Sequence, residues 1–452
     1  MEKQHESKRN RLVLVMYPLQ GHMNPILDLA SVLHSRGFSI TVAHTTLNPP
    51  DPASFPDFTF LPISDGISTW DISPSNLVNL AYTINRNCAA PFKGCLSQII
   101  HQEEQHGRVV CVIYDFLMHF AETAANEFNL PSIIFRTSNA AALLAFCTMA
   151  ELSAQGQDFI ARDSPSDDLV PGLFPLRFKD LPISSMGSLE KFSQLLAVVC
   201  SSRSSSAIIF NTTDCLENFP LTQLRRHYQI PFFHLGPLHR MAPKKPTNLV
   251  KDKNNCIKWL EKQARNSVIY VSLGSIATMD EKDLTEMAWG LALSEQPFLW
   301  VIRTCESEKK QLPEGFHELV GERGCVVEWA HQIEVLSHPA VGAFFTHCGW
   351  NSTLESICEG VPMICKPYFA DQTVNARYLT HEWGLGIELG NVIQRTEIEK
   401  AVRRILVENE GVEMRQKAIS LREQIKKCIK EGGCANNSLN EFVQFLSSFS
   451  EL

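Results

Sequence analysis

Residues able to recognise a phosphate group gather in the stretch 329–372. There the apolar run Val341–Thr346 is typical of a buried parallel strand, and it stops at residues 347–352, just before a predicted helix at 353–359. This order predicts a strand, a turn and a helix N-terminus. The amides and the positive dipole end of such a terminus favour an anion, and Gly349 lets the backbone come close to it. A phosphate group is therefore the predicted ligand.

A second interpretation of the same turn needs no ligand. Ser352 and Glu355 have the spacing of a capping box, in which the two side chains only satisfy amides at the helix end. The neighbouring residues favour a ligand, because the Trp329 indole can stack on a base and a carboxylate can hold ribose hydroxyls. Asp371 and Gln372 can bind sugar hydroxyls. Their order along the chain matches a nucleotide-sugar, from the base to the hexose.

The whole stretch resembles the signature box of plant family 1 UDP-dependent glycosyltransferases. The matching positions are Trp329, Gln332, the HCGWNS run at 347–352, Glu355, Gly360-Val361-Pro362, Pro367 and Asp371-Gln372. The family usually has proline where His331 stands. The resemblance implies stacking of uracil on Trp329, ribose contacts from Gln332 and Glu355, diphosphate contacts from His347, Asn351 and Ser352, sugar contacts from Trp350, Asp371 and Gln372, and further donor contacts from Ala330 and Ser275.

A candidate general base lies in the first half of the chain. His22 follows a predicted strand at 11–17 on a turn that contains Gly21, and an imidazole titrates near neutral pH, so it can take the proton of a hydroxyl. Asp115 ends a predicted strand at 109–114 and can fix the tautomer of an imidazole and stabilise its protonated form. The residues alone leave two other interpretations open, a polar surface histidine and an aspartate that only caps its strand.

The family resemblance favours the catalytic interpretation. GH-x-NP at 21–25 and an aspartate that ends a V-I-x-D strand both match the family, which uses this pair. The resemblance implies one direct displacement with inversion, so that an α-linked UDP-glucose co-substrate gives a β-glucoside. We expect neither a metal nor another cofactor, because helix amides, His347, Ser275 and Asn351 can meet the charge of the leaving diphosphate. The expected acceptor-binding residues are Gln20, Gly21, Thr137 and Phe369.

The composition is typical of a globular protein that acts on small molecules. The 452 residues suffice for two or three domains, and the net charge of -8, without a dense Lys/Arg run, argues against a nucleic-acid partner. The 14 cysteines are scattered without a C-x-x-C pair, so we expect reduced thiols. The polar start of the chain and the short apolar run after it predict neither a signal peptide nor a membrane span. We expect a cytoplasmic monomer.

Apolar runs alternate with helical patterns through both halves of the chain, which predicts an α/β protein. The first half begins with a βαβ pattern, a strand at 11–17, a helix at 24–35 and a strand at 38–44. The second half alternates in the same way from 268 to 389. Two Rossmann-like doubly wound domains facing a cleft are therefore predicted. The resemblance implies the GT-B fold, whose last helix returns to the first domain.

The predicted domain boundaries follow changes in composition. They define an acceptor-binding domain at 1–236, a Pro-, Lys- and Asn-rich linker at 237–255, a UDP-sugar-binding domain at 256–435 and a returning helix at 436–452. The stretches 64–75 and 155–195 are rich in Ser, Asp and Pro and are predicted to be long loops. We expect them to line the acceptor pocket, although plain surface excursions remain an alternative.

Two other functions are compatible with parts of the sequence. A dinucleotide-dependent oxidoreductase also uses Rossmann-like halves, but its G-x-G-x-x-G run is absent after the first strand. A non-catalytic protein that binds small molecules or sugar nucleotides would not need His22 and Asp115. The resemblance is closest to the family-76 group, through the runs LQGHMNP, RGFSITVAHT and STLESICEGVPMIC. It implies transfer of glucose to a hydroxyl, carboxyl or amine of a small plant metabolite or hormone.

Overall fold

The computed structural model describes residues 10–68, 73, 76–102, 107–155, 166–182, 189–201, 204–243, 255–274, 279–302, 312–390 and 392–451. The chain divides into two compact units, of which unit 1 comprises Met1–Ala161, Met186–Lys244 and Lys427–Leu452, and unit 2 comprises Arg162–Ser185 and Lys245–Lys426. The predicted domains 1–236 and 256–435 differ from these units at two places. Residues 162–185 belong to unit 2, and residues 427–435 belong to unit 1.

Unit 1 is built on a parallel sheet that has seven strands among the described residues, in the order β3-β2-β1-β4-β5-β6-β7. Its elements in chain order are β1 (Arg11–Val15), α1 (Gln20–Ser35), β2 (Ser39–Thr45), η1 (Pro52–Ser54), β3 (Thr59–Ile63), α2 (Leu77–His101), β4 (Val109–Asp115), α4 (Phe120–Glu127), β5 (Ser132–Arg136), α5 (Ala140–Ala154), α6 (Leu189–Val199), β6 (Ala207–Phe210), α7 (Asp214–His227), β7 (Phe232–His234), α8 (Leu238–Met241), α17 (Cys434–Ser448) and η7 (Phe449–Glu451).

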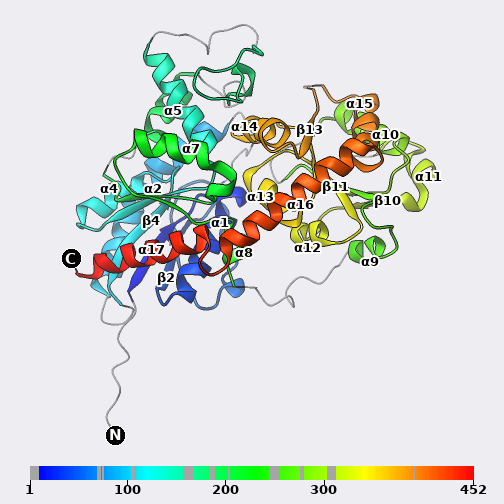
Figure 1. Ribbon diagram of the computed structural model, residues 1–452. Helices are drawn as coiled ribbons and strands as arrows, with labels where there is room; N and C mark the ends of the chain where they lie inside the picture. Colours follow the sequence, from blue (N-terminus) through cyan, green and yellow to red (C-terminus); the bar gives the residue numbers. More distant parts are fainter. Residues whose placement is uncertain are drawn as a thin grey trace. The chain divides into compact units, whose positions relative to one another are not determined.

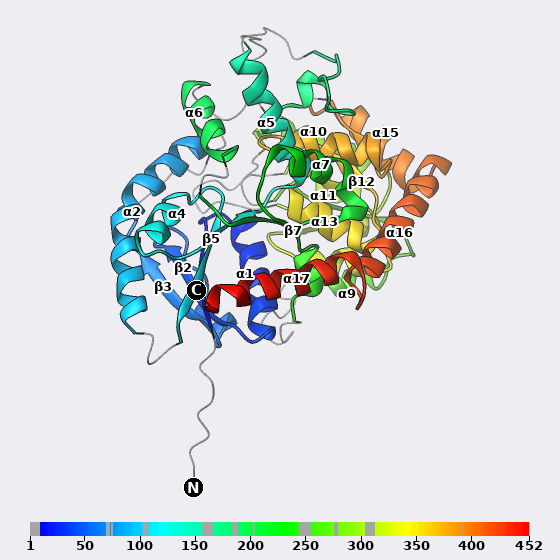
Figure 2. The ribbon, with the colours of Figure 1, turned by 60° about the vertical axis from the view of Figure 1, so that its left-hand side comes forward.

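The core of unit 1 lies on both faces of this sheet. β1 and β4 are buried along their whole length, which explains why their sequences are nearly continuous apolar runs. One face is covered by α1, α8 and α17 (Figure 1). On α17, the Phe442 ring lies 4.9 Å from that of Phe233 in β7, so the last helix packs on the first sheet as the resemblance implied. Helix α2 runs beside β3 and packs on α4 (Figure 2).

Unit 2 is built on a second parallel sheet, with six strands among its described residues in the order β10-β9-β8-β11-β12-β13. Its elements in chain order are η3 (Phe178–Asp180), α9 (Cys256–Leu260), β8 (Val268–Ser272), α10 (Glu281–Leu293), β9 (Phe298–Val301), α11 (Phe316–Val320), η5 (Gly321–Arg323), β10 (Gly324–Val327), α12 (Gln332–Ser337), β11 (Val341–Thr346), α13 (Trp350–Glu359), β12 (Met363–Cys365), α14 (Gln372–Arg377), η6 (Tyr378–Glu382), β13 (Gly386–Glu388), α15 (Arg395–Leu406) and α16 (Asn409–Ile429), whose last residues belong to unit 1.

Helices α10 and α15 pack side by side on the core of unit 2 (Figure 1). Arg395 of α15 also binds Glu286 of α10. Its backbone N–H and its Nε–H both donate to the Glu286 carboxylate, at 2.8 and 3.0 Å. Beneath them, Trp300 of β9 is one of the largest fully buried side chains. The sheet is therefore held by an apolar core with an ion pair at its rim.

Both sheets reverse their strand order at one point. In unit 1 the reversal falls between β1 and β4, and in unit 2 between β8 and β11. In open α/β sheets, ligands bind beyond the carboxyl ends of the strands at this switch point. The residues that end or follow these four strands are therefore the ones to examine for a site.

Several predicted boundaries differ from the structure because the patterns were local. The predicted loop 155–195 contains η3 and the beginning of α6, and neither α2 nor β7 was predicted. In the predicted linker 237–255, α8 is part of unit 1 and places Leu238 in its core, while residues 244–254 lie outside the described residues. None of the helices in the described ranges combines the length and apolar character that a membrane span needs.

Candidate active site

His22 and Asp115 meet at the switch point of unit 1. β1 and β4 pair with Val15 opposite Tyr114, so the groups at the ends of the two strands come together. The Nδ1–H of His22 donates a hydrogen bond of 2.8 Å to Oδ2 of Asp115, because an ionised carboxylate can only accept. This tautomer places the lone pair on Nε2, the nitrogen that can then take a proton.

The Asp115 side chain is fully buried and uses both of its oxygens. Its Oδ1 accepts the backbone N–H of Leu117 at 2.9 Å, and the hydroxyl of Thr137 donates to Oδ2 at 3.5 Å. The strand cap and the contact with histidine, which the residues alone left as alternatives, are therefore both present. A buried carboxylate with these partners is held in one orientation.

The imidazole of His22 is enclosed on several sides but keeps an open edge, since its side chain is 20% exposed. The rings of Tyr17 and Phe116 lie 5.1 and 5.8 Å from it, and the Thr137 oxygen lies 2.9 Å from Nδ1. Burial, together with the charge of Asp115, raises the pKa of the Tyr17 phenol, which therefore stays protonated. Within this cluster, the Nε2 atom of His22 is the group left to accept a proton.

The local backbone at His22 differs from the predicted turn that contains Gly21. Helix α1 begins at Gln20, so His22 lies in its first turn, and its backbone N–H donates to Leu19 at 2.8 Å. Pro25 lies inside the helix, where its missing N–H costs a single bond near the N-terminus. The predicted helix start at residue 24 was wrong, because the first two turns of α1 include both Gly21 and Pro25.

The four expected acceptor-binding residues fall in two groups. Gln20 and Gly21 are exposed at the start of α1, and Thr137 is buried beside His22. Phe369 belongs to unit 2, where its side chain is buried and its backbone N–H donates to Gln372.

The N-terminus of α13 lies at the switch point of unit 2. The helix begins at Trp350 with Gly349 as its cap residue, which has no side chain to make a cap hydrogen bond. Ser352 is therefore in the first turn and Glu355 in the second, so the capping-box interpretation was wrong. The amides at the start of a helix suit an anionic group.

A polar cluster joins α12 to α13 beside this terminus. The Nε2–H groups of Gln332 donate to Ser352 Oγ at 2.9 Å and to Glu355 Oε2 at 2.7 Å, and the Tyr270 hydroxyl donates to Gln332 Oε1 at 3.4 Å. Gln332 is the first residue of α12. Three residues to which the resemblance assigned ribose or phosphate contacts are thus adjacent in space.

The imidazole of His347 fills the space between two glycines. A Cβ atom at Gly274, which follows β8, would lie 2.7 Å from its Cε1 and Nε2, and one at Gly349 would lie 2.5 Å from Nε2. Only glycine at both positions leaves room for the ring. Cys348, between His347 and Gly349 in the sequence, takes a left-handed backbone with φ of 64°. The Nδ2–H of Asn375 donates to the Cys348 carbonyl at 2.9 Å and holds this conformation. Strained backbone of this kind gathers at functional sites.

Asp371 and Gln372 are held by backbone and side-chain bonds at the start of α14. Gln372 Oε1 accepts the backbone N–H groups of Tyr368 and Phe369, at 2.9 and 3.1 Å, which identifies this atom as the amide oxygen. Asp371 Oδ2 accepts Nδ2–H of Asn375 at 3.1 Å. The residue before this pair, Ala370, also has a left-handed backbone, with φ of 56°. Both side chains are therefore pre-organised.

The remaining expected donor residues differ in exposure. The Trp329 side chain is 41% exposed, as a ring that stacks on a base requires, and Ala330 beside it is buried. The Trp350 indole is only 3% exposed and lies 6.4 Å from the ring of Trp383, so it is packed inside unit 2. Asn351 lies in the first turn of α13, and Ser275 lies outside the described residues.

The sequence did not single out several residues that shape these two sites. Asn375, Gly274 and the ring of Phe116 were not predicted, and Thr137 was expected to contact the acceptor rather than His22. Two signals were available, the position of Phe116 directly after Asp115 and that of Gly274 directly before the expected donor residue Ser275. Within the described part of the chain, no three or more His, Cys, Asp or Glu residues are grouped as a metal site.

Comparisons with known proteins assign the chain to a family. Residues 239–420 match the family model described as UDP-glucoronosyl and UDP-glucosyl transferase. UDP-glycosyltransferase 76E1 of Arabidopsis thaliana is 44% identical over 97% of this chain and 97% of its own length. Flavonol 3-O-glucosyltransferase UGT76E12 of the same plant is 44% identical over 97% of each chain.

A solved structure shows the same fold. Phytolacca americana UGT2, complexed with UDP-2fluoro-glucose and pterostilbene, has a TM-score of 0.82 and 28% identity over 97% of this chain and 99% of its own. The GT-B fold expected from the resemblance is thereby confirmed. The alternatives of a dinucleotide-dependent oxidoreductase and a non-catalytic protein do not fit these relatives, which are named as transferases. With 44% identity over nearly its whole length to group-76 enzymes, the chain belongs to the plant UDP-glycosyltransferase family, a family of hexosyltransferases.

Proposed function

We propose that this enzyme is an inverting UDP-glucose-dependent glucosyltransferase in which His22 is the general base and Asp115 positions it. The observation that carries the proposal is the 2.8 Å hydrogen bond between them, which leaves Nε2 of an otherwise enclosed imidazole as the proton acceptor. In this mechanism Nε2 takes the proton of the acceptor hydroxyl while the acceptor oxygen bonds to the anomeric carbon and the bond to UDP breaks. The buried charge of Asp115 stabilises the imidazolium that forms.

Unit 2 would hold the donor, with UDP as the leaving group. Trp329 offers a ring face to the uracil, and the Gln332–Glu355 pair offers polar atoms to the ribose. The start of α13 with Asn351, Ser352 and the enclosed His347 would receive the diphosphate. Fixed helix amides aimed at the leaving group provide the stabilisation that a metal ion provides in other transferases.

The similar proteins support a broad class of small-molecule acceptors. One relative is named as a flavonol 3-O-glucosyltransferase, and the similar solved structure contains pterostilbene. Flavonols and pterostilbene both carry hydroxyl groups on their rings. We propose a small plant metabolite or hormone with a hydroxyl, carboxyl or amine as the acceptor. The test is a panel of phenols, acids, amines and terpenoid alcohols with UDP-glucose, read by product mass. A hexose added to at least one class, with one UDP released per product, is expected; UDP release without any glucoside would contradict the proposal.

The donor should be UDP-glucose in preference to UDP-galactose. Because Gln372 Oε1 is occupied by two backbone N–H groups, its NH₂ is the end that can donate to a sugar hydroxyl, and inverting that hydroxyl leaves a polar group unpaired. We expect about a fivefold to hundredfold preference for glucose, from a cost of about 1 to 3 kcal/mol. Competition between equal concentrations of the two donors measures it.

One variant tests whether the NH₂ group of Gln372 causes the preference for glucose. Gln372→Glu keeps an oxygen for the N–H groups of Tyr368 and Phe369, and it replaces the NH₂ donor with a second oxygen of a negatively charged carboxylate. The preference should fall towards unity in this variant. Equal or greater product from UDP-galactose in the wild-type enzyme would show that Gln372 does not select the sugar.

Gly349→Ala should weaken UDP binding without unfolding the protein. The backbone at Gly349 suits alanine, with φ of -61°, but the added Cβ would lie 2.5 Å from Nε2 of His347 and push the ring aside. Loss of one hydrogen bond to a charged phosphate predicts about a tenfold to hundredfold rise in Kd. Calorimetric titration with UDP measures the Kd, with Gly390→Ala as the control, since nothing lies within 4 Å of a Cβ there. The same Kd in both variants would remove His347 from the phosphate site.

A further inference from the structure

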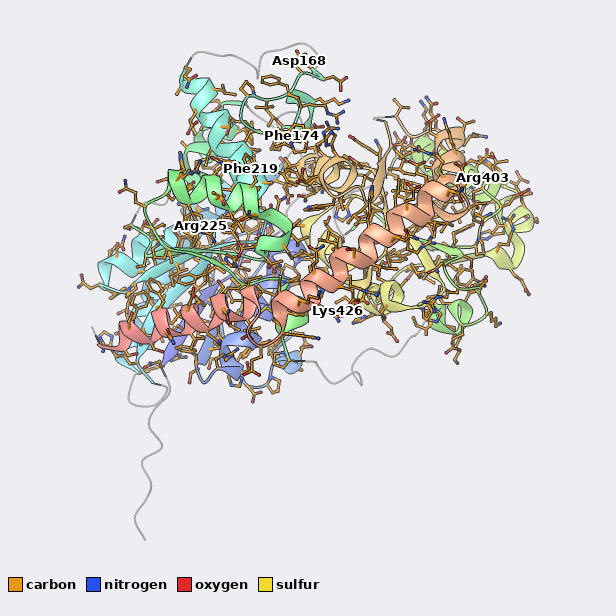
Figure 3. All side chains as sticks on the ribbon, in the orientation of Figure 1. Asp168, Phe174, Phe219, Arg225, Arg403 and Lys426 are labelled. Atoms are coloured by element: carbon orange, nitrogen blue, oxygen red, sulfur yellow. The ribbon has the colours of Figure 1, made fainter. Side chains whose placement is uncertain are left out.

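Residues 166–182, here called the 166–182 segment, fold back on themselves within unit 2. The backbone N–H groups of Val170 and Phe178 donate to Leu176 and Asp168, at 2.9 and 3.0 Å. Leu173 and Leu176 are buried, whereas the ring of Phe174 is exposed, and the segment's outer residues Asp168 and Phe174 are marked in Figure 3. The segment is therefore a compact loop with apolar residues of its own.

Asp180 is the ionic centre of this loop. Its side chain is 3% exposed, and its two oxygens accept Nε–H and Nη2–H of Arg177, each at 2.8 Å, in a bidentate pair. The backbone N–H of Arg177 donates to the same carboxylate at 2.8 Å. These bonds to Asp180 raise the pKa of Arg177. A bidentate pair on a buried carboxylate is costly to break, because the burial of the remaining charge is then less well compensated.

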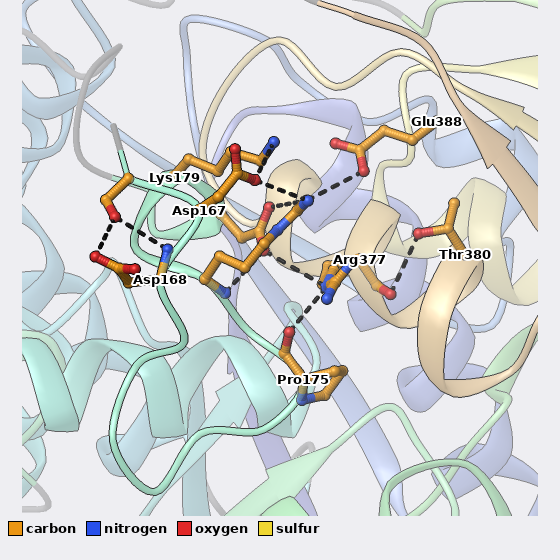
Figure 4. Close-up of polar contacts among 10 residues, drawn as sticks. Asp167, Asp168, Pro175, Lys179, Arg377, Thr380 and Glu388 are labelled. Carbon is orange, nitrogen blue, oxygen red and sulfur yellow. Dashed lines mark hydrogen bonds and ion pairs between the residues drawn. The ribbon is translucent and has the colours of Figure 1, made fainter. Parts of the chain in front are cut away.

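Four contacts join the loop to the elements that follow β12. Arg377 donates Nε–H to the carbonyl of Pro175 at 2.8 Å, and Arg177 Nη2 lies 3.3 Å from Glu388 Oε2 (Figure 4). The Phe174 ring meets that of His381 edge-on at 5.3 Å. Arg377 Nε also lies 3.7 Å from Asp180 Oδ2, so the one buried carboxylate is shared by two guanidinium groups.

These contacts bear on the helix that carries the candidate sugar residues. Arg377 is the last residue of α14 and Gln372 is its first, so about 8 Å of helix axis separates them. In the middle of α14, the Nδ2–H group of Asn375 donates to the carbonyl of Cys348, in the turn between β11 and α13. A helix of this length moves as one body, so its position at Gln372 depends on how it is held at Arg377.

We propose that the 166–182 segment is a positioning element for the donor sugar: through Asp180 and Arg377 it fixes α14 and thereby sets how sharply Asp371 and Gln372 distinguish glucose from its epimers. The proposal rests on the proposed contact of Asp371 and Gln372 with the sugar. Asp180, Arg177 and Arg377 are positioning residues, because each acts through α14.

The test measures sugar recognition without any acceptor. Calorimetric titration gives the Kd values of UDP, UDP-glucose and UDP-galactose for the wild-type enzyme and for Arg377→Met, which keeps the apolar stem and removes the donor to Pro175. We expect the Kd of UDP to change by less than about twofold, whereas the Kd of UDP-glucose rises by about three- to tenfold and the preference over UDP-galactose falls by a similar factor.

Two further variants separate positioning from general stability. Arg404→Met removes an arginine of unit 2 that pairs with Glu410 at 2.7 Å, away from α14, and should leave all three Kd values unchanged. Arg377→Lys keeps a cationic donor and should restore part of the preference. Asp180→Asn should lower the preference in the same direction, and its effect combined with Arg377→Met should be smaller than the sum of the two, because both act on one contact.

The outcomes distinguish this proposal from the proposed function. If Gln372→Glu lowers the preference and folded Arg377→Met and Asp180→Asn do not, the sugar contact stands and the positioning role is overturned. If Gln372→Glu has no effect either, the sugar contact itself fails, and the positioning role fails with it. If Arg377→Met does not fold, the comparison of Arg377→Lys with Asp180→Asn decides, and an unchanged preference in both overturns the role.

Discussion

His22→Ala should lower turnover by about 10² to 10⁴, the usual contribution of a general base, while leaving the Kd of UDP near that of the wild-type enzyme. The imidazole is the group of its cluster that can take a proton, since Asp115 is fully buried and occupied and the Tyr17 phenol stays protonated. UDP binding should persist because the candidate nucleotide site is built from α12 and α13 of unit 2, whereas His22 belongs to unit 1.

Steady-state kinetics with one acceptor, together with titration of UDP, measure the two effects on the same preparation. His34→Ala is the matched control, because His34 lies in the last turn of the same helix and contacts Phe58. That variant should keep its turnover. Retention of most of the wild-type turnover by His22→Ala would place the base elsewhere, and loss of UDP binding would indicate a structural role for His22.

Asp115→Asn should lower kcat by about 10² to 10³, with a smaller change in the acceptor KM, because an amide neither fixes the Nδ1–H tautomer nor stabilises the imidazolium. The expected loss is limited by Thr137, whose oxygen lies 2.9 Å from Nδ1 and can accept its hydrogen. The asparagine keeps an oxygen for the N–H of Leu117, so the strand cap survives and the melting temperature should change little.

Thr137→Val combined with Asp115→Asn checks this account of the residual activity. The double variant should lose more turnover than Asp115→Asn alone, because no acceptor then remains beside Nδ1. A large drop in melting temperature for Asp115→Asn with only a small loss of kcat would instead make the carboxylate a structural cap.

The sequence predicted the strands of both sheets better than the helices around them. β1, β4 and β11 are buried on both faces, so their apolar runs carry the signal by themselves. α2 was missed although its pattern is amphipathic, and α13 and α1 begin earlier than predicted, because residues that were predicted to form turns belong to their first turns. Turn patterns in a sequence are local, whereas packing against neighbouring elements decides where a helix begins.

The candidate sites were predicted residue by residue, but their internal contacts were not. The Gln332–Glu355 pair spans two helices, and the Gly274–His347 contact spans two strands that neighbour each other only because the sheet reverses its order there. No spacing along the chain indicates such a contact. The place of the 166–182 segment in unit 2 was hidden for the same reason, since its sequence lies between two elements of unit 1, α5 and α6.

The anomeric configuration of the product tests the central claim most directly. A single base at His22, with a direct displacement of UDP, inverts the anomeric carbon, so UDP-glucose with its α linkage should give only the β-glucoside. Proton NMR of the purified product distinguishes the two anomers through the coupling between the protons on carbons 1 and 2 of the sugar. A large coupling, from two axial protons, is the result that this account predicts. An α-glucoside would contradict it, because a single displacement from the face opposite UDP cannot retain the configuration of the anomeric carbon.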